Sequence, residues 1–239
     1  MIKFYKNNKG QSLIELSVSV GITSMALITI LSLITVSIIT QRKSSNYYTA
    51  VNLAREAIEA ARNIRDTNWL LIEQQENAGS VTTKWDDNLH DSLTYSAVLR
   101  FDPDNVFPTT QSKYLFDFTE IGSILDSRKI IYKKNLVGNG TIYLDYATVA
   151  GCFNDCSETT FKRWVYLKPI CDGSYPNRPV SLDNCDKDQI TNNFICNNGG
   201  ACDPNSAPQI GIRVIVEVNW QEGSKSNSLK LVEDLYNWR

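Results

Sequence analysis

The fold of this chain is decided close to its start, by residues 9–40, which read KGQSLIELSVSVGITSMALITILSLITVSIIT. From Leu16 to Thr40 no residue is charged, which leaves an uninterrupted run of 25 uncharged residues. As a helix this run is roughly 37 Å long, enough to cross a bilayer core of about 30 Å. Nine of its residues are serine or threonine, whose hydroxyls can donate hydrogen bonds to helix carbonyls. We therefore predict a transmembrane helix over residues 11–40.

The ten residues before this helix, MIKFYKNNKG, contain three lysines and no acidic residue. Basic residues beside a membrane span favour the cytoplasmic side, so we expect the N-terminus in the cytoplasm and the head of the protein outside it. Arg42 and Lys43 flank the other end of the run and weaken this preference. An ordinary secretory signal is followed by a cleavage site of the A-x-A type. The nearest triplet here, residues 35–37 (TVS), fits that pattern poorly.

Glu15 is the only charged residue in the segment 11–40. A carboxylate at the centre of a bilayer is unfavourable by a few kcal/mol or more, and it is usually retained for a partner. The simpler interpretation places Glu15 at the membrane interface, where its side chain reaches water. The residues on either side of Glu15 bear on this choice.

Four features coincide here, namely a short basic leader, a glycine at its end, the motif Leu-Ile-Glu-Leu and the apolar run. In these features the chain closely resembles the type IV pilin and pseudopilin family. The resemblance implies that a prepilin peptidase cuts between Gly10 and Gln11, and that Gln11 is then N-methylated. It also implies that Glu15, the fifth residue after the cut, pairs with the N-terminus of a neighbouring subunit.

The same resemblance implies the partners of the N-terminal helix, which are other pilin or pseudopilin subunits, membrane lipid and an inner-membrane assembly platform. The chain departs from the family pattern at two points. The first residue after the cut is usually Phe and is Gln11 here, which puts the rate of processing and methylation in doubt. No proline lies in 11–40, where many major pilins carry one, so we expect an unbroken helix.

The pairing implied for Glu15 has a physical basis. A cut after Gly10 leaves a cationic amine on Gln11, about one helical turn from Glu15. A carboxylate and an ammonium buried together compensate each other, whereas either one alone is costly to bury. The sequence does not distinguish pairing within one chain from pairing between two subunits.

The helical pattern continues through residues 41–74, which we expect to prolong the stem helix. One face recurs there at spacings of three and four, with Tyr47, Val51, Ala54, Ile58, Ala61 and then Ile64 or Arg65. The pattern predicts one helix to about Asp66, fading by Gln75, with its apolar face packed on a head domain. Residues 54–70, AREAIEAARNIRDTNWL, also resemble a segment that is common after the stem of prepilin-like proteins.

Residues 75–239 are expected to form a β-rich globular head. Alternation and turn residues predict strands at 92–101, 113–118, 129–132, 141–147, 161–167, 210–220 and 229–238. Val214, Val216, Val218 and Trp220 are predicted to share one buried face. The predicted fold class is α+β, with a long N-terminal helix packed on an antiparallel β-sheet, which is also the architecture that the resemblance to pilins implies.

Between residues 169 and 208 the alternation disappears, and Asn, Asp, Gly, Pro and Ser dominate. We interpret this segment as an insertion between two neighbouring strands. A structureless loop of this length is expected to be functional or cross-linked. The chain has six cysteines, Cys152, Cys156, Cys171, Cys185, Cys196 and Cys202, and the last four of them lie in the insertion.

Disulfides are the default expectation for these cysteines if the head lies outside the cytoplasm. Pairing in sequence order is the simplest of the 15 connectivities, and the sequence alone does not decide among them. A zinc site is the competing interpretation, and free or mixed thiols are the third. Zinc would require C-x2-C pairs or a nearby histidine, whereas the only histidine, His90, is distant in sequence.

Three carboxylates, Asp183, Asp186 and Asp188, cluster around Cys185. Clustered oxygen ligands can bind calcium, and some pseudopilins bind calcium in the head. The three do not match the D-x-[DN]-x-[DN]-G calcium loop, and acidic surface loops are common. We therefore predict no cofactor and keep calcium as an alternative.

The net charge and the motifs of the chain argue against two classes of function, nucleic-acid binding and catalysis. The net charge of −2 gives no electrostatic reason to expect nucleic-acid binding. No phosphate-binding loop or nucleophile motif points to an enzyme. The leading hypothesis is a structural subunit of a type IV pilus or of a secretion or competence pseudopilus, and the large insertion favours a minor or tip subunit. The alternative is an unprocessed, single-pass membrane-anchored binding module, which would need neither the Lys9-Gly10 junction nor Glu15.

Overall fold

The computed structural model describes residues 11–89, 96–101, 114–118, 130–135, 141–144, 156–174, 185–197, 202 and 207–238. The chain divides into two units, Met1–Thr49 and Ala50–Arg239, and each is described by itself. The first unit contains the N-terminal part of helix α1 (Gln11–Ala78). The second contains the rest of α1 and a sheet with nine strands among the described residues. The predicted α+β fold, a long N-terminal helix packed on an antiparallel sheet, is confirmed.

Helix α1 is 68 residues long and ends twelve residues beyond the predicted Asp66. Its end is set by Gly79, which has a φ of +78°. The amide of Gly79 donates to the carbonyl of Glu76, and the amide of Ser80 donates to the carbonyl of Gln75, both at 3.1 Å. These two bonds form a Schellman motif, which requires a left-handed residue directly after the helix. Glycine adopts that conformation without steric cost, so the helix ends here.

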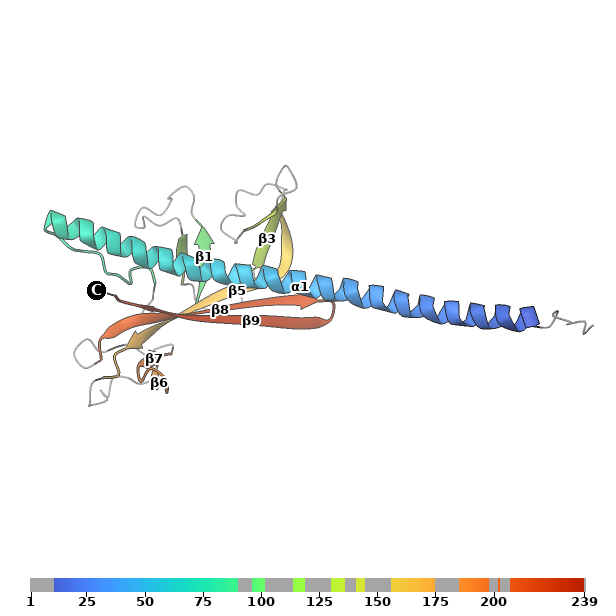
Figure 1. Ribbon diagram of the computed structural model, residues 1–239. Helices are drawn as coiled ribbons and strands as arrows, with labels where there is room; N and C mark the ends of the chain where they lie inside the picture. Colours follow the sequence, from blue (N-terminus) through green and yellow to red (C-terminus); the bar gives the residue numbers. More distant parts are fainter. Residues whose placement is uncertain are drawn as a thin grey trace, which may run out of the picture. The chain divides into compact units, whose positions relative to one another are not determined.

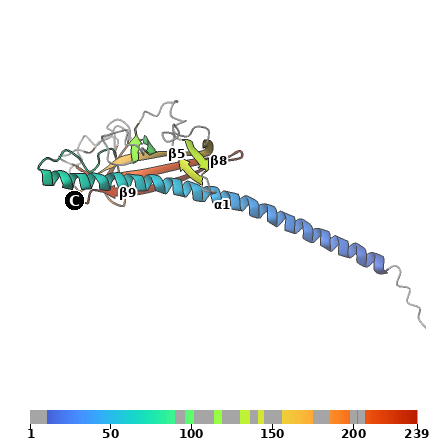
Figure 2. The same cartoon turned by 90° about the horizontal axis from the view of Figure 1, so that it is seen from above.

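Strand β5 (Cys156–Cys171) is the middle strand of the sheet. Strand β8 (Gln209–Glu222) pairs antiparallel with residues 162–171 of β5, and β9 (Lys225–Tyr236) pairs antiparallel with β8 (Figures 1 and 2). The turn between β8 and β9 is Gly223-Ser224, with a φ of +61° at Gly223. Glycine at the first position of a two-residue turn is a common hairpin signal. The predicted C-terminal hairpin is therefore confirmed.

Among the described residues, three short antiparallel strand pairs lie along the other edge of β5. Strand β3 (Ile130–Asn135) pairs with the N-terminal part of β5 and with β4 (Thr141–Leu144). Strand β1 (Ser96–Phe101) pairs with the middle of β5 and with β2 (Tyr114–Asp117). Strand β7 (Phe194–Cys196) pairs with the C-terminal end of β5 and with β6 (Cys185–Lys187). The last hairpin lies inside the insertion and was not predicted.

The core of the second unit lies between α1 and the sheet. On the helix, Ala50, Ala54, Ala57 and Ala61 have no exposed surface, so the helix backbone can approach the sheet closely. On the sheet, Val214, Val216, Val218 and Trp220 of β8 are buried, as predicted, and Ile215 between them is buried too. The predicted helix face is also confirmed at Ala54, Ile58, Ala61 and Ile64, whereas Val51 is only partly buried and Tyr47 is half exposed.

A charged side chain, that of Arg163, is buried at the contact between α1 and the sheet. The side chain of Arg163 on β5 is only 3% exposed, and its Nη1 donates to the carbonyl oxygen of Leu53 at 2.9 Å and to Glu56 Oε2 at 2.6 Å. A second arginine, Arg62, donates through Nε to Glu233 Oε1 at 2.7 Å, and this hydrogen bond raises the pKa of Arg62. Both contacts join α1 to the sheet at the flanks of the alanine face.

The alanine face gives a first prediction. Replacing Ala57 by leucine adds volume where the helix already contacts the sheet, so we expect Ala57→Leu to lower the free energy of unfolding by about 1–3 kcal/mol. The measurement is urea unfolding followed by tryptophan fluorescence. Asn52→Leu, at an exposed position of the same helix segment, is the matched control and should stay within about 0.5 kcal/mol of the wild type. Equal effects of the two variants would contradict the packing described above.

Candidate functional site

Two regions carry the candidate functional residues, and the first is the apolar segment of α1. Its large apolar side chains between Leu13 and Ile39 keep 47% to 72% of their surface exposed. An 18-residue window of this helix has a mean hydropathy of 2.3, and none of it is buried. Among the described residues, α1 is the one helix whose length and composition suffice to cross a membrane. An exposed apolar surface of this extent requires lipid or protein to cover it.

Seven of the nine serine and threonine hydroxyls between Leu16 and Thr40 donate hydrogen bonds within the helix, as expected. Ser17 donates to the carbonyl oxygen of Leu13 at 2.7 Å, Thr23 to that of Ser19 at 2.8 Å, and Thr35 to that of Leu31 at 2.9 Å. Ser24, Thr29 and Thr40 make equivalent contacts one turn back along the helix. Because each of these hydroxyls has an internal acceptor, the polar residues are compatible with an apolar environment.

The predicted N-terminal site residues lie at the start of α1. Gln11 begins the helix, and Glu15 follows one turn later with an exposed side chain. The backbone carbonyl of Glu15 accepts a hydrogen bond from the Ser19 hydroxyl at 2.7 Å. Gly10 and the rest of the leader lie outside the described residues.

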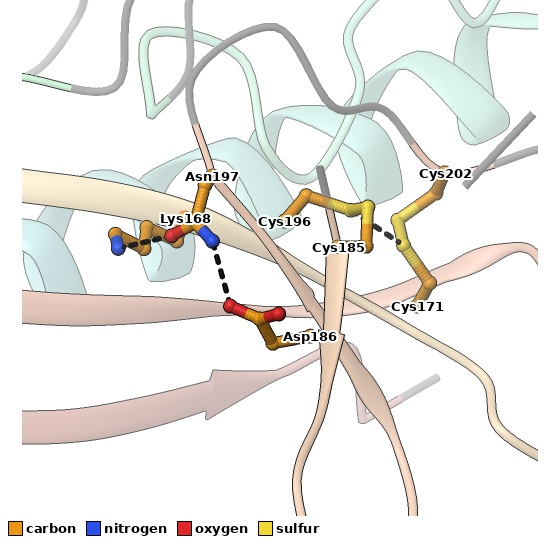
Figure 3. Close-up of a disulfide and its surroundings, with 7 residues drawn as sticks. All are labelled: Lys168, Cys171, Cys185, Asp186, Cys196, Asn197 and Cys202. Atoms are coloured by element: carbon orange, nitrogen blue, oxygen red, sulfur yellow. Dashed lines mark hydrogen bonds between the residues drawn. A yellow bond between two sulfur atoms is a disulfide. The ribbon is translucent and has the colours of Figure 1, made fainter. Parts of the chain in front are cut away.

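The second region is the insertion, which has a small core of its own. Cys171, Cys185, Phe194, Cys196 and Ala207 are buried together, with Cys202 packed against them. The two disulfides of this cluster are Cys171–Cys202 and Cys185–Cys196 (Figure 3). They touch, because the Sγ atoms of Cys171 and Cys196 are 3.4 Å apart. Cys156 is also disulfide-bonded, and Cys152 lies outside the described residues.

Pairing in sequence order is therefore wrong within the insertion, because the two bridges are nested. The reason is the unpredicted hairpin of β6 and β7, whose register places Cys185 directly opposite Cys196. Their Cα atoms are 3.9 Å apart, so a bridge between them is the local choice. The outer bridge then joins the end of β5 to Cys202. The general expectation of disulfides is confirmed for the described cysteines, since none of them is free.

The positions of the cysteines and aspartates can be compared with the zinc and calcium alternatives. Among the described residues, the only clustered ligand types are the sulfur atoms of Cys171, Cys196 and Cys202, within 4.8 Å of one another. All three belong to disulfides and offer no thiolate to a metal. Of the calcium candidates, Asp183 lies outside the described residues. Asp186 accepts a hydrogen bond from Asn197, and Asp188 is ion-paired with Arg213.

Asp188 holds the hairpin between β6 and β7 in place. Its Oδ1 accepts from the amides of Ile190 at 2.9 Å and Thr191 at 3.1 Å, and its Oδ2 accepts from Arg213 Nη2 at 2.9 Å. These hydrogen bonds, the backbone ones first, lower the pKa of Asp188 to about 2. Arg213 also binds both carboxylate oxygens of Asp234, at 2.7 and 2.8 Å, and this contact raises the pKa of Arg213. The insertion is thus tied by charge to β8 and β9.

Backbone hydrogen bonds close the loop that connects β6 and β7. The amide of Asp188 donates to the carbonyl of Asn193 at 2.8 Å, and the amide of Asn192 donates to the carbonyl of Asp188 at 2.9 Å. Gly173 lies so close to Asn192 that an added Cβ would be 1.8 Å from its carbonyl oxygen. A larger residue at 173 would therefore push the hairpin away from the end of β5.

Sequence reasoning missed Lys168 on β5, Arg213 on β8 and Asn197 directly after β7, whose side chains contact acidic or amide groups of the insertion. Arg213 is one of the polar positions that alternate with the buried residues of β8, and that alternation marked it only as a surface residue. Lys168 and Asn197 are 29 residues apart and meet only because β7 pairs with β5. No spacing rule on one sequence could have found them.

Comparison with known proteins adds no relative. No family model, curated protein or solved structure matches the chain.

The lowered pKa of Asp188 gives a second prediction. Because its folded pKa of about 2 lies below the unfolded value of 3.8, the carboxylate stabilises the fold above about pH 4, and this stabilisation is lost as the pH falls toward 2. Asp188→Asn should therefore be less stable than the wild type at pH 7. The difference between the two proteins in urea unfolding should shrink as the pH falls from 4 to 2, because Asp188 is then about half protonated in the folded state. A difference that is the same at both pH values would contradict the role of the charge.

Proposed function

We propose that this chain is a structural subunit of a type IV pilus or of a related secretion or competence pseudopilus. In this proposal a prepilin peptidase removes residues 1–10, and the mature chain assembles through its N-terminal helix. The head then contributes the outer surface of the filament. The observation that carries the proposal is a helix that buries one face on the sheet from Ala50 to Ile64 yet exposes a long apolar segment before it, with the single carboxylate Glu15 at the start.

The exposed apolar segment supports assembly because it serves two environments. In the membrane, lipid covers side chains such as Leu16 and Ile28. In a filament, the same side chains from neighbouring subunits would cover one another, so that the apolar surface stays out of water. The internal hydrogen bonds of Ser17, Thr23 and Thr35 suit both environments, since none of these hydroxyls depends on water.

Glu15 supports the same proposal through its position. If the chain begins at Gln11, the cationic N-terminus and Glu15 are one helical turn apart on α1. In an apolar bundle each of these charges needs an opposite charge, and a neighbouring subunit carries both. The pair would then fix the axial position of each new subunit. A simple membrane anchor has no use for either charge.

The disulfides of the head support a location of the head outside the cytoplasm. All described cysteines are in disulfides, which persist in oxidising compartments and are rare in the cytoplasm. The insertion adds a separate, disulfide-linked element at one end of β5. An addition of this size is better tolerated at a filament tip or at rare positions than in a closely packed repeating subunit, which supports a proposed role as a minor subunit.

Processing is tested by the mass and the N-terminal sequence of the full chain, extracted from membranes of a host that has a prepilin peptidase. We expect a mature chain that begins at Gln11, with or without one methyl group. Gly10→Val should block the cut, because a bulkier side chain stands at the scissile bond. A wild-type chain that still begins MIKFYK would contradict the proposal and favour the membrane-anchored binding module.

Assembly is tested by the substitution Glu15→Ala. We expect the variant to insert into the membrane and to be processed, but to be lost from sheared filaments, because the N-terminal ammonium of its neighbour no longer has a partner. Ser17→Ala, one half-turn away on the same helix, is the matched control and should assemble normally. If Glu15→Ala enters filaments as well as the wild type, Glu15 has no role in assembly.

A further inference from the structure

Three side chains form a chain of hydrogen bonds beside the inner disulfide. The ammonium nitrogen Nζ of Lys168 on β5 donates to Asn197 Oδ1 at 2.7 Å. On the other side of the same amide, Asn197 Nδ2 donates to Asp186 Oδ2 at 2.9 Å. Figure 3 shows the amide of Asn197 between the amine and the carboxylate. An amine, an amide carbon and a carboxyl group are thus held together in one line of contacts.

The strand register explains why these residues meet. Strand β7 pairs with β5 through Ile170 opposite Ile195, and the same antiparallel register, continued by two residues, places Lys168 opposite Asn197. Residues directly opposite each other on paired strands point to the same face, so both side chains lie on one side of the sheet. Asp186 and Asn197 directly follow Cys185 and Cys196, whose disulfide fixes them relative to each other.

We propose that Lys168 and Asn197 form an intramolecular isopeptide bond, with Asp186 as the acid–base group of the reaction. The bond would join Nζ of Lys168 to Cγ of Asn197. It would cross-link β5 covalently to β7, the strand at the centre of the insertion. The inference does not depend on the proposed assembly function.

The distances are suited to this reaction. A carbonyl bond is about 1.2 Å long, so Cγ of Asn197 lies within about 4 Å of Lys168 Nζ. Reacting atoms in near-attack arrangements are about 3–3.5 Å apart, so a small rotation of either side chain is sufficient. Asp186 already contacts Nδ2, the nitrogen that must leave. Strand pairing and the disulfide hold the three groups together and reduce the entropic cost of bringing them into register.

The protonation state of Lys168 favours attack. An ammonium has no lone pair, so only the neutral amine can act as nucleophile. Burial of Lys168, followed by the nearby positive charge of Lys230, lowers the pKa of its amine. Arg213 opposes the ammonium as well, while Asp186 and Glu217 favour it. The net effect is a larger neutral fraction than a lysine in water has at the same pH.

The reaction balances without a cofactor or an oxidant. The lone pair of the neutral Nζ attacks Cγ, and a C–N bond forms as the carbonyl π electrons move to Oδ1. The Asp186 carboxylate accepts a proton from Nζ and delivers it to Nδ2. The carbonyl then re-forms, the Cγ–Nδ2 bond breaks, and Nδ2 leaves as ammonia. The product is a secondary amide, and the chain is lighter by one ammonia.

The tryptic map of the chain makes the bond directly observable. Lys168 and Arg178 each precede a proline and resist trypsin, so Lys168 falls in the peptide 164–187. Asn197 falls in the next peptide, 188–213. Both insertion disulfides join these same two peptides. After complete reduction and alkylation, the two peptides therefore separate unless a bond that is not a disulfide joins them.

The experiment is this digest, carried out on the full chain extracted from membranes in detergent. We expect mass spectrometry to find peptides 164–187 and 188–213 as one species, lighter than their sum by one ammonia. Fragmentation should place the link between Lys168 and Asn197. Loss of ammonia from the intact chain is not sufficient evidence, because Gln11 as a new N-terminus, or Asn139 and Asn198 before glycine, can lose it too.

Two variants supply the controls. Lys168→Arg keeps the positive charge and the tryptic map, since the substituted position still precedes Pro169, and it should give the two peptides separately. Asp186→Ala keeps both reacting groups and should lose most of the cross-link, while the two disulfides still form. A wild-type digest in which the reduced peptides are fully separate overturns the proposal. A linked species that persists in Lys168→Arg overturns it as well.

Discussion

The contact on which this structure depends is the packing of the alanine face of α1 against the buried residues of β5 and β8. Ala54, Ala57 and Ala61 have no exposed surface and belong to the same buried cluster as residues of β5 and β8. This packing fixes β5, and every other described strand pairs with β5 directly or through one neighbour. Arg163 is buried at the same interface, where Leu53 and Glu56 compensate its charge.

The parts of the fold that could be predicted are those in which local period and burial agree. The spacing of Ala54, Ile58 and Ala61 marked the helix face, and the alternation from Val214 to Trp220 marked β8. The full length of β5 was not apparent, because its first residues pair with β3 but are polar and exposed. Strands β6 and β7 have three residues each and form only against the end of β5, so they leave no period in the sequence.

The candidate site divides in the same way. The leader, Glu15 and the apolar run are contiguous, so their meaning can be argued from the sequence, although no relative supports it. The cysteines predicted disulfides but not their pairing, which follows from the register of a hairpin that was not predicted. Lys168, Asn197 and Arg213 become neighbours of Asp186 and Asp188 only through pairing between strands that are distant in sequence. Which distant strands pair depends on the packing of the whole sheet, so three-residue strands such as β6 and β7 are not revealed by their own residues.

The outer disulfide of the nested pair has a consequence for resistance to proteases. The outer bridge joins residues 171 and 202, so a protease that cuts any single peptide bond between them leaves the two fragments covalently joined. Strands β8 and β9, which complete the core, lie after this region and would remain attached to the helix and to β5. A single cut within the insertion therefore does not separate β8 and β9 from the rest of the head.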